Sequence, residues 1–288
     1  MPLWEDATKI NPEELPDFEL LCAGFPCQAF SIAGKRLGFE ESRGTLFFEI
    51  ARVARQKRPK FLLLENVKGL LSHDRGKTFA NILATMDELG YDAEWQVFNS
   101  KYWVPQNRER IFIIGHLRNK GTKKIFPIKE DGGVSVKGQE ATTVRTLTGR
   151  GHSGGLHSQM TLIYHNKSDT QAKRIYNCSG ISPSLGVGHT MQSPNIIIPV
   201  LTPDRLNKRQ NGRRFKEDGE PSFSLTTQDK HGIYDGKRIR RLTPLECERL
   251  QGFPDGWTEG VSDTQRYKQL GNAVTVPVVE FILGELKD

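Results

Sequence analysis

The sequence has few cysteines and no long apolar run, and each shortage excludes a class of protein. Four cysteines are spread without paired spacing, so the chain shows neither a disulfide framework nor a zinc signature. The histidines also lack the compact spacing of metal ligands, and we expect no metal. Signal peptides and apolar stretches long enough to span a bilayer are missing as well. We therefore expect a protein of a reducing cytoplasm without a membrane partner.

What the chain does have is enough apolar content for a core and an excess of positive charge. Its 288 residues, 36% of them apolar, suit one large domain and one small one. A formal net charge of +7 suits a polyanionic partner, although such an excess often serves only solubility. The basic residues form two tracts that could bind phosphates: Arg118, Lys120, Lys123 and Lys124, and then Arg205, Lys208, Arg209, Arg213, Arg214 and Lys216.

One cysteine stands in an unusual place, in the segment Ala-Gly-Phe-Pro-Cys-Gln-Ala-Phe at 23–30. The apolar run Phe18 to Cys22 precedes it, so Cys27 is predicted in a loop just past a buried strand, where α/β sheets place their chemistry. Pro26 and Gln28 favour a rigid turn there. A lone cysteine more often packs as a small buried hydrophobe, and we expect this of the other three, Cys22, Cys178 and Cys247.

The elements that follow alternate between strands and helices. Helical spacing of apolar residues predicts helices at 45–54 and 79–90, the second ending at Gly90. A short continuous apolar run at 59–67 predicts a buried strand with Glu65 near its end. Further strands are predicted at 93–98 and 110–115. This order predicts an α/β fold.

An acid and two arginines accompany these strand ends. Arg108 and Arg110 precede the last strand, and on an extended chain they would share a face. With Cys27 and Glu65 they suit alkylation of a pyrimidine at C5: a thiolate adds to C6, an acid binds N3, and an arginine donates to O2. Nearby arginines would also favour the thiolate, since free cysteine has a pKa of about 8.5. Each group also has a structural interpretation: Glu65 as a helix cap, the arginines as surface charges.

Five motifs occur in an informative order: Pro26-Cys27-Gln28, Glu65-Asn66-Val67, Gln106 to Arg110, Arg240 to Pro254, and Gln269 to Val274. In these motifs, and over nearly its whole length, the chain resembles the DNA cytosine-5 methyltransferases of bacterial restriction-modification systems and phages. The resemblance implies a Rossmann-like methyltransferase sheet with a smaller, mostly β recognition domain. It also implies methyl transfer from S-adenosylmethionine to C5 of a cytosine flipped out of double-stranded DNA.

The resemblance also implies roles for individual residues. Cys27 would attack C6, Glu65 would engage N3 and the exocyclic amine, and Arg110 would bind O2 with support from Arg108. The positions that match the cofactor pocket are Asp6, Pro26, Leu46, Asn272, Ala273 and Val274. The positions that match DNA contacts, most of them in a loop that closes over the flipped base, are Gln28, Ser31, Lys35, Arg36, Arg43 and Gln106.

The sequence departs from the family at its start. The family opens with a strand and a Phe-x-Gly-x-Gly turn for the methionine end of the cofactor, and this chain matches only from the third cofactor-contacting motif onward. Roughly fifty residues would be missing, which leaves the sheet incomplete and 19–23 as an apolar edge. The glycines at 149, 151 and 154 do not replace the turn, since no amphipathic helix follows them.

Three explanations of this departure remain open. The chain could be one part of a split methyltransferase that needs a complementing polypeptide, the product of a misplaced start codon or decayed gene, or an excised fragment. The second is slightly favoured because the sequence matches the family from its first residues. Each explanation puts the activity of the isolated chain in question, so a DNA-binding protein without turnover is one alternative function. A tRNA cytosine-5 methyltransferase is another, although the long recognition segment favours DNA.

The change of composition near residue 119 predicts the domain boundaries. Residues 1–118 and 237–288 are assigned to the catalytic domain, and 119–236 to the recognition domain. In this segment, three Ser/Thr-Leu passages each lead to a histidine, at His152, His189 and His231. They are either strand-loop units that present side chains to base edges or ordinary turns of a small β-domain.

Overall fold

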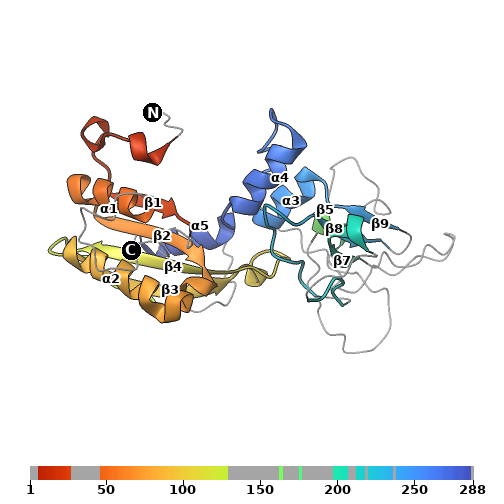
Figure 1. Ribbon diagram of the computed structural model, residues 1–288, viewed down its shortest axis with the longest axis horizontal. Helices are drawn as coiled ribbons and strands as arrows, with labels where there is room; N and C mark the ends of the chain where they lie inside the picture. The colour runs from red at the N-terminus through yellow and green to blue at the C-terminus, as the bar shows by residue number, and fades with distance from the viewer. Residues whose placement is uncertain are drawn as a thin grey trace, which may run out of the picture. The chain divides into compact units, whose positions relative to one another are not determined.

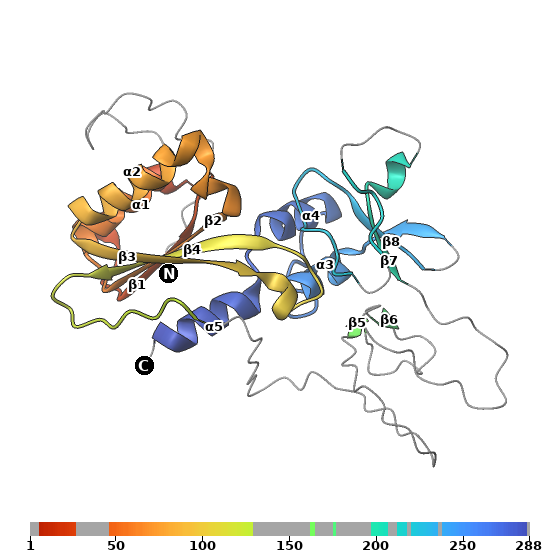
Figure 2. The ribbon, with the colours of Figure 1, turned by 90° about the horizontal axis from the view of Figure 1, so that it is seen from below.

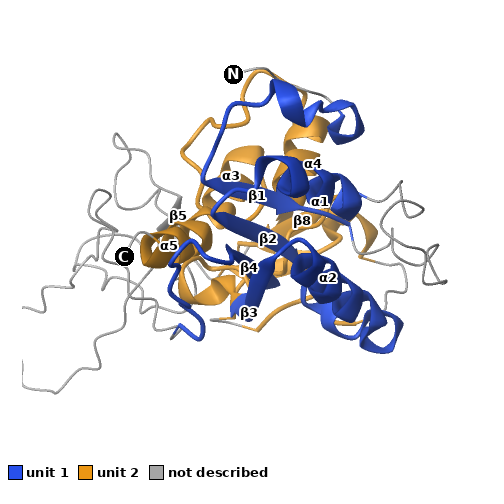
Figure 3. Cartoon of the chain, turned by 90° about the vertical axis from the view of Figure 1, so that its left-hand side faces the viewer, with its two compact units in different colours: residues 1–98, 109–129 blue, residues 99–108, 130–288 orange. Residues whose placement is uncertain are grey.

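The computed structural model of the chain is shown in Figure 1. It describes residues 6–26, 46–128, 162–164, 175–176, 197–206, 212–217, 220–235 and 238–286. The chain divides into two compact units, which Figure 3 colours separately. Unit 1 comprises residues 1–98 and 109–129, and unit 2 comprises residues 99–108 and 130–288. These units rest on packing within the chain, whereas the predicted domains rest on function, so the recognition segment stays a prediction.

Unit 1 is built on a four-stranded mixed sheet with the order β1-β2-β4-β3. Its strands are β1 (Leu20–Gly24), β2 (Phe61–Val67), β3 (Tyr91–Asn99) and β4 (Glu109–Leu117). β1 runs parallel to β2, and β4 runs antiparallel to β2. β1 therefore lies at one edge of this sheet, as the sequence predicts for residues 19–23.

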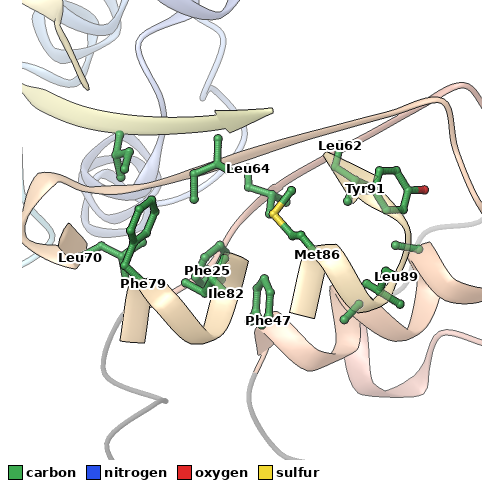
Figure 4. Close-up of a cluster of buried hydrophobic side chains, with 14 of the residues drawn as sticks. Phe25, Phe47, Leu62, Leu64, Leu70, Phe79, Ile82, Met86, Leu89 and Tyr91 are labelled. Carbon is green, nitrogen blue, oxygen red and sulfur yellow. The ribbon is translucent and has the colours of Figure 1, made fainter. Parts of the chain in front are cut away.

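Two helices cover one face of this sheet, α1 (Leu46–Lys57) and α2 (Lys77–Glu88), as Figure 2 shows. Their apolar faces pack on β2 and β4 in one continuous core (Figure 4). Both helices lie where the spacing of apolar residues predicts them. Gly90 follows the end of α2 at a φ of +82°, in the left-handed region that glycine favours. The core includes Phe25, Phe47, Leu62, Leu64, Phe79, Ile82, Met86, Ile111 and Ile113.

The opposite face of the sheet holds the chain segment that leaves β4. Glu94 on β3 accepts hydrogen bonds from the backbone N–H groups of Ile125 and Phe126, at 2.9 and 3.1 Å, and from His116 Nε2 at 2.8 Å. The Phe126 ring lies 5.6 Å from that of Phe98. Polar and apolar contacts together fix residues 125–128 against β3.

The described part of unit 2 combines small antiparallel sheets with helices. The strands are β5 (Leu162–Tyr164) paired with β6 (Ile175–Tyr176), and the sheet β7-β8-β9. The second sheet comprises Ile198–Leu201, His231–Tyr234 and Ile239–Arg241, and the helices are α3 (Pro244–Gln251), α4 (Asp263–Asn272) and α5 (Val276–Leu286). Residues of β8, α3 and α4 and of the segments beside them form a second core of Ile197, Leu225, Ile233, Leu242, Cys247, Leu250 and Leu270.

Local sequence explains where α3 begins and ends. Thr243 and Glu246 form a capping box at its start, where each side chain bonds the other residue's backbone N–H. Pro244 occupies the first turn, where its missing N–H leaves no bond unmade. Gly252 ends the helix at a φ of +77°. Short 3-10 turns complete the described structure: η1 (Ala7–Lys9), η2 (Pro12–Glu14), η4 (Lys68–Leu71), η5 (His73–Gly76), η6 (Ser100–Tyr102) and η8 (Pro203–Arg205).

Candidate active site

Strand direction brings the predicted catalytic segments together in unit 1. Gly24, the last residue of β1, pairs with Glu65 on parallel β2. Because β4 is antiparallel to β2, its first residues lie beside the last residues of β2, and Arg110 pairs with Val67. The ends of β1 and β2 and the beginning of β4 therefore lie side by side at one end of the sheet. This is where the sequence predicts the catalytic residues.

Glu65 and Arg110 form an ion pair at this end of the sheet. The distance from Arg110 Nε to Glu65 Oε1 is 2.9 Å, and the two side chains are 18% and 17% exposed, respectively. Burial lowers the pKa of the Arg110 guanidinium, and the carboxylate of Glu65 opposes that shift. A guanidinium keeps its charge at any physiological pH. The pair is thus a charged, half-buried group that can still meet a ligand.

A small residue opposite Glu65 keeps space around its second oxygen. A Cβ atom at Gly24 would stand 3.2 Å from Glu65 Oε2, closer than most Cβ contacts. Any side chain there would press on the carboxylate. Glycine at this point of β1 therefore leaves room for the Glu65 carboxylate.

Asn66 fixes the backbone that leads to Cys27. Its Nδ2 donates to the carbonyl oxygen of Phe25 at 2.6 Å, and its Oδ1 accepts from the backbone N–H of Val67 at 2.9 Å. Asn66 is 3% exposed, and the buried Phe25 ring packs 5.3 Å from that of Phe47. The chain is thus anchored two residues before Cys27. Asn66 was not among the predicted site residues, although its place beside Glu65 in the motif was a signal.

Several predicted site residues lie outside the part of the chain that the structure describes. They are Cys27, the proposed nucleophile, and the predicted DNA contacts Gln28, Ser31, Lys35, Arg36 and Arg43. The three glycines at 149, 151 and 154 and the histidine patterns at 152 and 189 lie outside it too. Their roles stay predictions.

Arg108 corrects the expectation that the two arginines share a face. It belongs to unit 2, is 2% exposed, and precedes the first residue of β4. Its Nη1 donates to the carbonyl of Leu225 at 2.7 Å, and its Nη2 donates to that of Ala273 at 2.7 Å and of Gly271 at 3.2 Å. The extended chain assumed for both arginines begins only at Glu109, so Arg110 alone pairs with Glu65.

Gln106 also corrects a prediction, because it is fully buried. Its Nε2 donates to the carbonyl of Leu250 at 2.8 Å, and its Oε1 accepts from the backbone N–H of Leu225 at 2.8 Å. With an exposed fraction of 0%, the side chain has no surface to offer DNA. It joins backbone segments within unit 2 instead.

The predicted cofactor residues fall into two groups. In unit 1, Pro26 and Leu46 leave apolar surface exposed, and Leu46 is 39% exposed at the start of α1. Asp6 caps η1, and its hydrogen bonds with Thr8 lower the pKa of the carboxyl group. In unit 2, Asn272 is exposed at the end of α4, and Ala273 and Val274 follow it, half-buried.

The two described cysteines differ in exposure. Cys247 is buried in the core of unit 2, which confirms the prediction, and burial raises the pKa of its thiol to about 12. Cys22 was expected to be buried too, but it is exposed. The reason is its position on β1, an edge strand whose side chains are only partly covered.

The His231 pattern is a turn rather than a displayed polar loop. His231 is 7% exposed, and its Nε2 accepts from the backbone N–H of Thr226 at 3.3 Å. Burial lowers the pKa of His231 to about 4. At this one described copy, the interpretation as an ordinary turn of a small β-domain is favoured.

Some of the described residues of the basic tracts are engaged in ion pairs. Arg118 binds Asp87 and Asp92, and Arg213 binds Glu220. Lys216 lies over the ring of Phe223, 4.9 Å from its centroid. Within the described ranges, no helix could cross a membrane, and no group of histidine, cysteine and acidic side chains could hold a metal ion.

The fold and the Glu65–Arg110 pair define a class of protein: an α/β protein with an acid and a guanidinium at adjoining strand ends. Comparison with known proteins narrows the class. The family model for C-5 cytosine-specific DNA methylase matches residues 3–288. The chain is 35% identical to the orphan methyltransferase M.SPRI of Bacillus phage SPR, over 98% of this chain and 85% of that protein. It is 37% identical to the type II methyltransferase M.HpaII of Haemophilus parainfluenzae, over 96% and 73%.

A solved structure agrees on the fold. The crystal structure of S. pombe Dnmt2 methyltransferase matches with a TM-score of 0.59 at 19% identity, over 98% of this chain and 82% of that one. The chain belongs to the C-5 cytosine-specific DNA methylase family. The predicted family and the α/β methyltransferase fold are thus confirmed.

Proposed function

We propose that this protein transfers a methyl group from S-adenosylmethionine to C5 of a cytosine that is flipped out of duplex DNA, through a covalent adduct between Cys27 and C6. The observation that carries the proposal is the Glu65–Arg110 ion pair, which lies at the end of the sheet where β1 ends and the chain continues to Cys27. Membership of the family supplies the reaction class.

Glu65 is assigned to the side of cytosine that carries N3 and the 4-amino group. Arg110 holds its Oε1, while Oε2 faces the space beside Gly24. The Glu65 carboxyl group would accept a hydrogen bond from the 4-amino group and, when it carries a proton, donate one to N3. This pair of contacts selects cytosine over thymine, which presents a carbonyl and an N–H at the same positions. Bound there, the acid stabilises the charge that reaches N3 as the thiolate adds.

Arg110 is assigned to the carbonyl O2. Its Nε binds Glu65 and its Nη1 donates to the carbonyl of Glu109 at 2.8 Å. These two bonds fix the plane of the guanidinium before any base arrives. A fixed cation is effective where negative charge develops, because the protein need not reorganise during the reaction.

Cys27 is assigned the covalent step. The thiolate forms a bond to C6, and the electron pair of the C5–C6 double bond makes C5 nucleophilic. After C5 gains its methyl group, a base removes the C5 proton, and the returning electron pair expels the thiolate. The anchor from Asn66 to the Phe25 carbonyl holds the backbone that leads to this nucleophile.

The residues present in unit 1 fit the methyl donor. Pro26 and the 39% exposed Leu46 offer apolar contact for a purine ring. Asp6 carries an ionised carboxylate, since its pKa is lowered by Thr8, and can accept from an amino or hydroxyl group. The donor, when bound, supplies an electrophilic methyl group. The resemblance adds Asn272, Ala273 and Val274 to the residues that contact it.

DNA binding is assigned to the basic tracts and to the recognition segment 119–236. Extracting one base costs a few kcal/mol of stacking, and phosphate contacts would offset it with an affinity that falls as salt rises. Arg205 and Lys216 are the described candidates in the second tract, because no ion pair to an acid is recorded for either within the described ranges. The predicted loop residues would close over the base.

Transfer of a labelled methyl group to mixed-sequence duplex tests the proposal. The Cys27→Ala variant should transfer nothing and still bind duplex, whereas the control Cys22→Ser, which changes an exposed cysteine, should keep wild-type activity. Methylation by Cys27→Ala would overturn the mechanism. Binding of duplex without transfer by the wild type would favour a DNA-binding protein, and transfer to tRNA alone would favour an RNA substrate.

A further inference from the structure

Arg108 is a buried, extensively hydrogen-bonded side chain of unit 2 that the proposed chemistry does not use. Arg108 is 2% exposed and donates to three carbonyl oxygens, those of Leu225, Gly271 and Ala273, within 3.2 Å. Ser224 Oγ lies 3.4 Å from the same guanidinium. Burying a guanidinium is unfavourable unless such bonds replace its water, so the geometry around Arg108 is closely specified.

Two remote chain segments meet on this guanidinium. Residues 271–273 end α4, and a cation beside the last carbonyls of a helix is favourable both for their hydrogen bonds and for the helix dipole. Residues 224–226 lie at the end of the predicted recognition segment. Arg108 therefore ties the end of a helix to a loop that comes from a different part of the chain.

The two segments also touch each other directly. A Cβ atom at Gly271 would stand 2.6 Å from the carbonyl carbon and oxygen of Thr226. Gly271 thus permits a backbone approach that no other residue allows. A shift of one segment must be transmitted to the other, because no gap separates them.

A second set of bonds stabilises the same arrangement. Thr275 Oγ1 donates to Gln251 Oε1 at 3.0 Å, and Gln251 Nε2 donates to the Leu270 carbonyl at 2.8 Å. Gln106 binds the Leu225 N–H and the Leu250 carbonyl. The backbone on both sides of Asn272 is therefore held from within unit 2, which leaves Asn272 itself exposed.

We infer that Arg108 is a positioning residue that couples the donor-contacting segment 272–274 to the recognition-side segment 224–226, so that binding of DNA and binding of the methyl donor affect one another. This inference rests on the proposed function, which assigns the donor to 272–274. Arg108 touches neither reacting atom. It acts by fixing the carbonyls of Gly271 and Ala273.

Kinetics of Arg108→Lys test the inference. A lysine cannot reach all three carbonyls, so the KM for S-adenosylmethionine should rise at least tenfold while kcat stays within threefold. Prior addition of duplex should also no longer lower the donor's Kd. The control Arg249→Lys, which retains an ion pair with Asp255 in the same unit, should behave as wild type. A loss of kcat at unchanged KM would overturn the inference, because Arg108 would then act on the base.

Hydrogen exchange of the wild type gives a second measurement, independent of turnover and of whether the variant folds. Adding cytosine-containing duplex alone should slow exchange in peptides that cover both 222–230 and 270–276. Protection of 222–230 without 270–276 would refute the coupling. If the wild type transfers no methyl group, the proposed function fails, while this exchange result still decides whether the two segments that Arg108 joins are coupled.

Discussion

Two arginines separated by one residue have opposite surroundings, and the difference shows how burial divides chemistry from architecture. Arg110 is 18% exposed, belongs to unit 1 and pairs with an acid that can meet a ligand. Arg108 is 2% exposed, belongs to unit 2 and binds backbone carbonyls. A guanidinium that keeps access to solvent can be assigned to substrate, whereas one enclosed by carbonyls determines where the backbone lies.

The largest effect should come from the acid that Arg110 holds. Glu65→Gln keeps the shape of the side chain but removes its charge and its acidity, so kcat should fall by about 10²–10⁴-fold. Steady-state methyl transfer measures this loss. Glu49→Gln is a matched control, because Glu49 is 15% exposed and pairs with Arg52 at 2.8 Å on α1. Equal losses in the two variants would remove the special role of Glu65.

The next effect separates the two arginines by stability. Arg108→Met should lower the free energy of unfolding by about 3–5 kcal/mol, because it leaves buried carbonyls without donors. Arg110→Met should lower it by about 1 kcal/mol, since its partner can be hydrated, and should instead reduce methyl transfer. Urea unfolding checks the order of the two variants. A larger loss of stability in Arg110→Met would reverse the comparison.

A smaller effect concerns His231, which is buried and accepts a hydrogen bond from the backbone N–H of Thr226. Its folded pKa of about 4 lies below the ordinary 6.5, because burial disfavours the charged ring. The unfolded chain takes up a proton near pH 6.5 and the folded one only near pH 4. Stability should therefore be full above pH 6.5 and fall by at most about 1.4 kcal/mol per pH unit down to pH 4.

Urea unfolding from pH 7 to pH 4 checks this pH dependence against the His231→Gln variant. Glutamine can accept the same Thr226 hydrogen bond but cannot titrate. The stability advantage of the wild type should shrink as the pH falls. A constant difference between the two proteins would exclude His231 as the titrating group.

The smallest effect is expected at an exposed arginine. Arg118 pairs with Asp87 and Asp92 while 42% of its side chain is exposed. Arg118→Ala should shift the midpoint of thermal unfolding by no more than about 2 °C, because water screens such pairs. Calorimetry that found a shift as large as that of Arg108→Met would show that burial is not the deciding variable.

The sequence predicted the strand ends well because short apolar runs and helical spacing are local signals. The order of the elements made it possible to expect Glu65 and Arg110 at the same end of the sheet. That β4 is antiparallel to β2 could not be read from the sequence, since an apolar run has the same pattern in either direction. The antiparallel pairing is what places Arg110, near the start of its strand, beside Glu65.

The errors all concern long-range contacts. Gln106 and Arg108 are polar residues in a polar motif, and nothing near them in sequence shows that the backbone of Leu225, Leu250 and Ala273 surrounds them. Cys22 was misjudged for the opposite reason. Its apolar neighbours predicted burial, while its exposure follows from the edge position of β1.

The most direct measurement of the central claim is covalent trapping on duplex DNA that carries 5-fluorocytosine, with S-adenosylmethionine present. Fluorine at C5 leaves no proton to remove, so the bond from the protein to C6 should persist through denaturation. We expect a trapped complex whose peptide map places the base on Cys27, with no complex for Cys27→Ala and a much slower one for Glu65→Gln. A base attached at another residue, or methyl transfer to ordinary duplex without any trapped complex, would contradict the proposed mechanism.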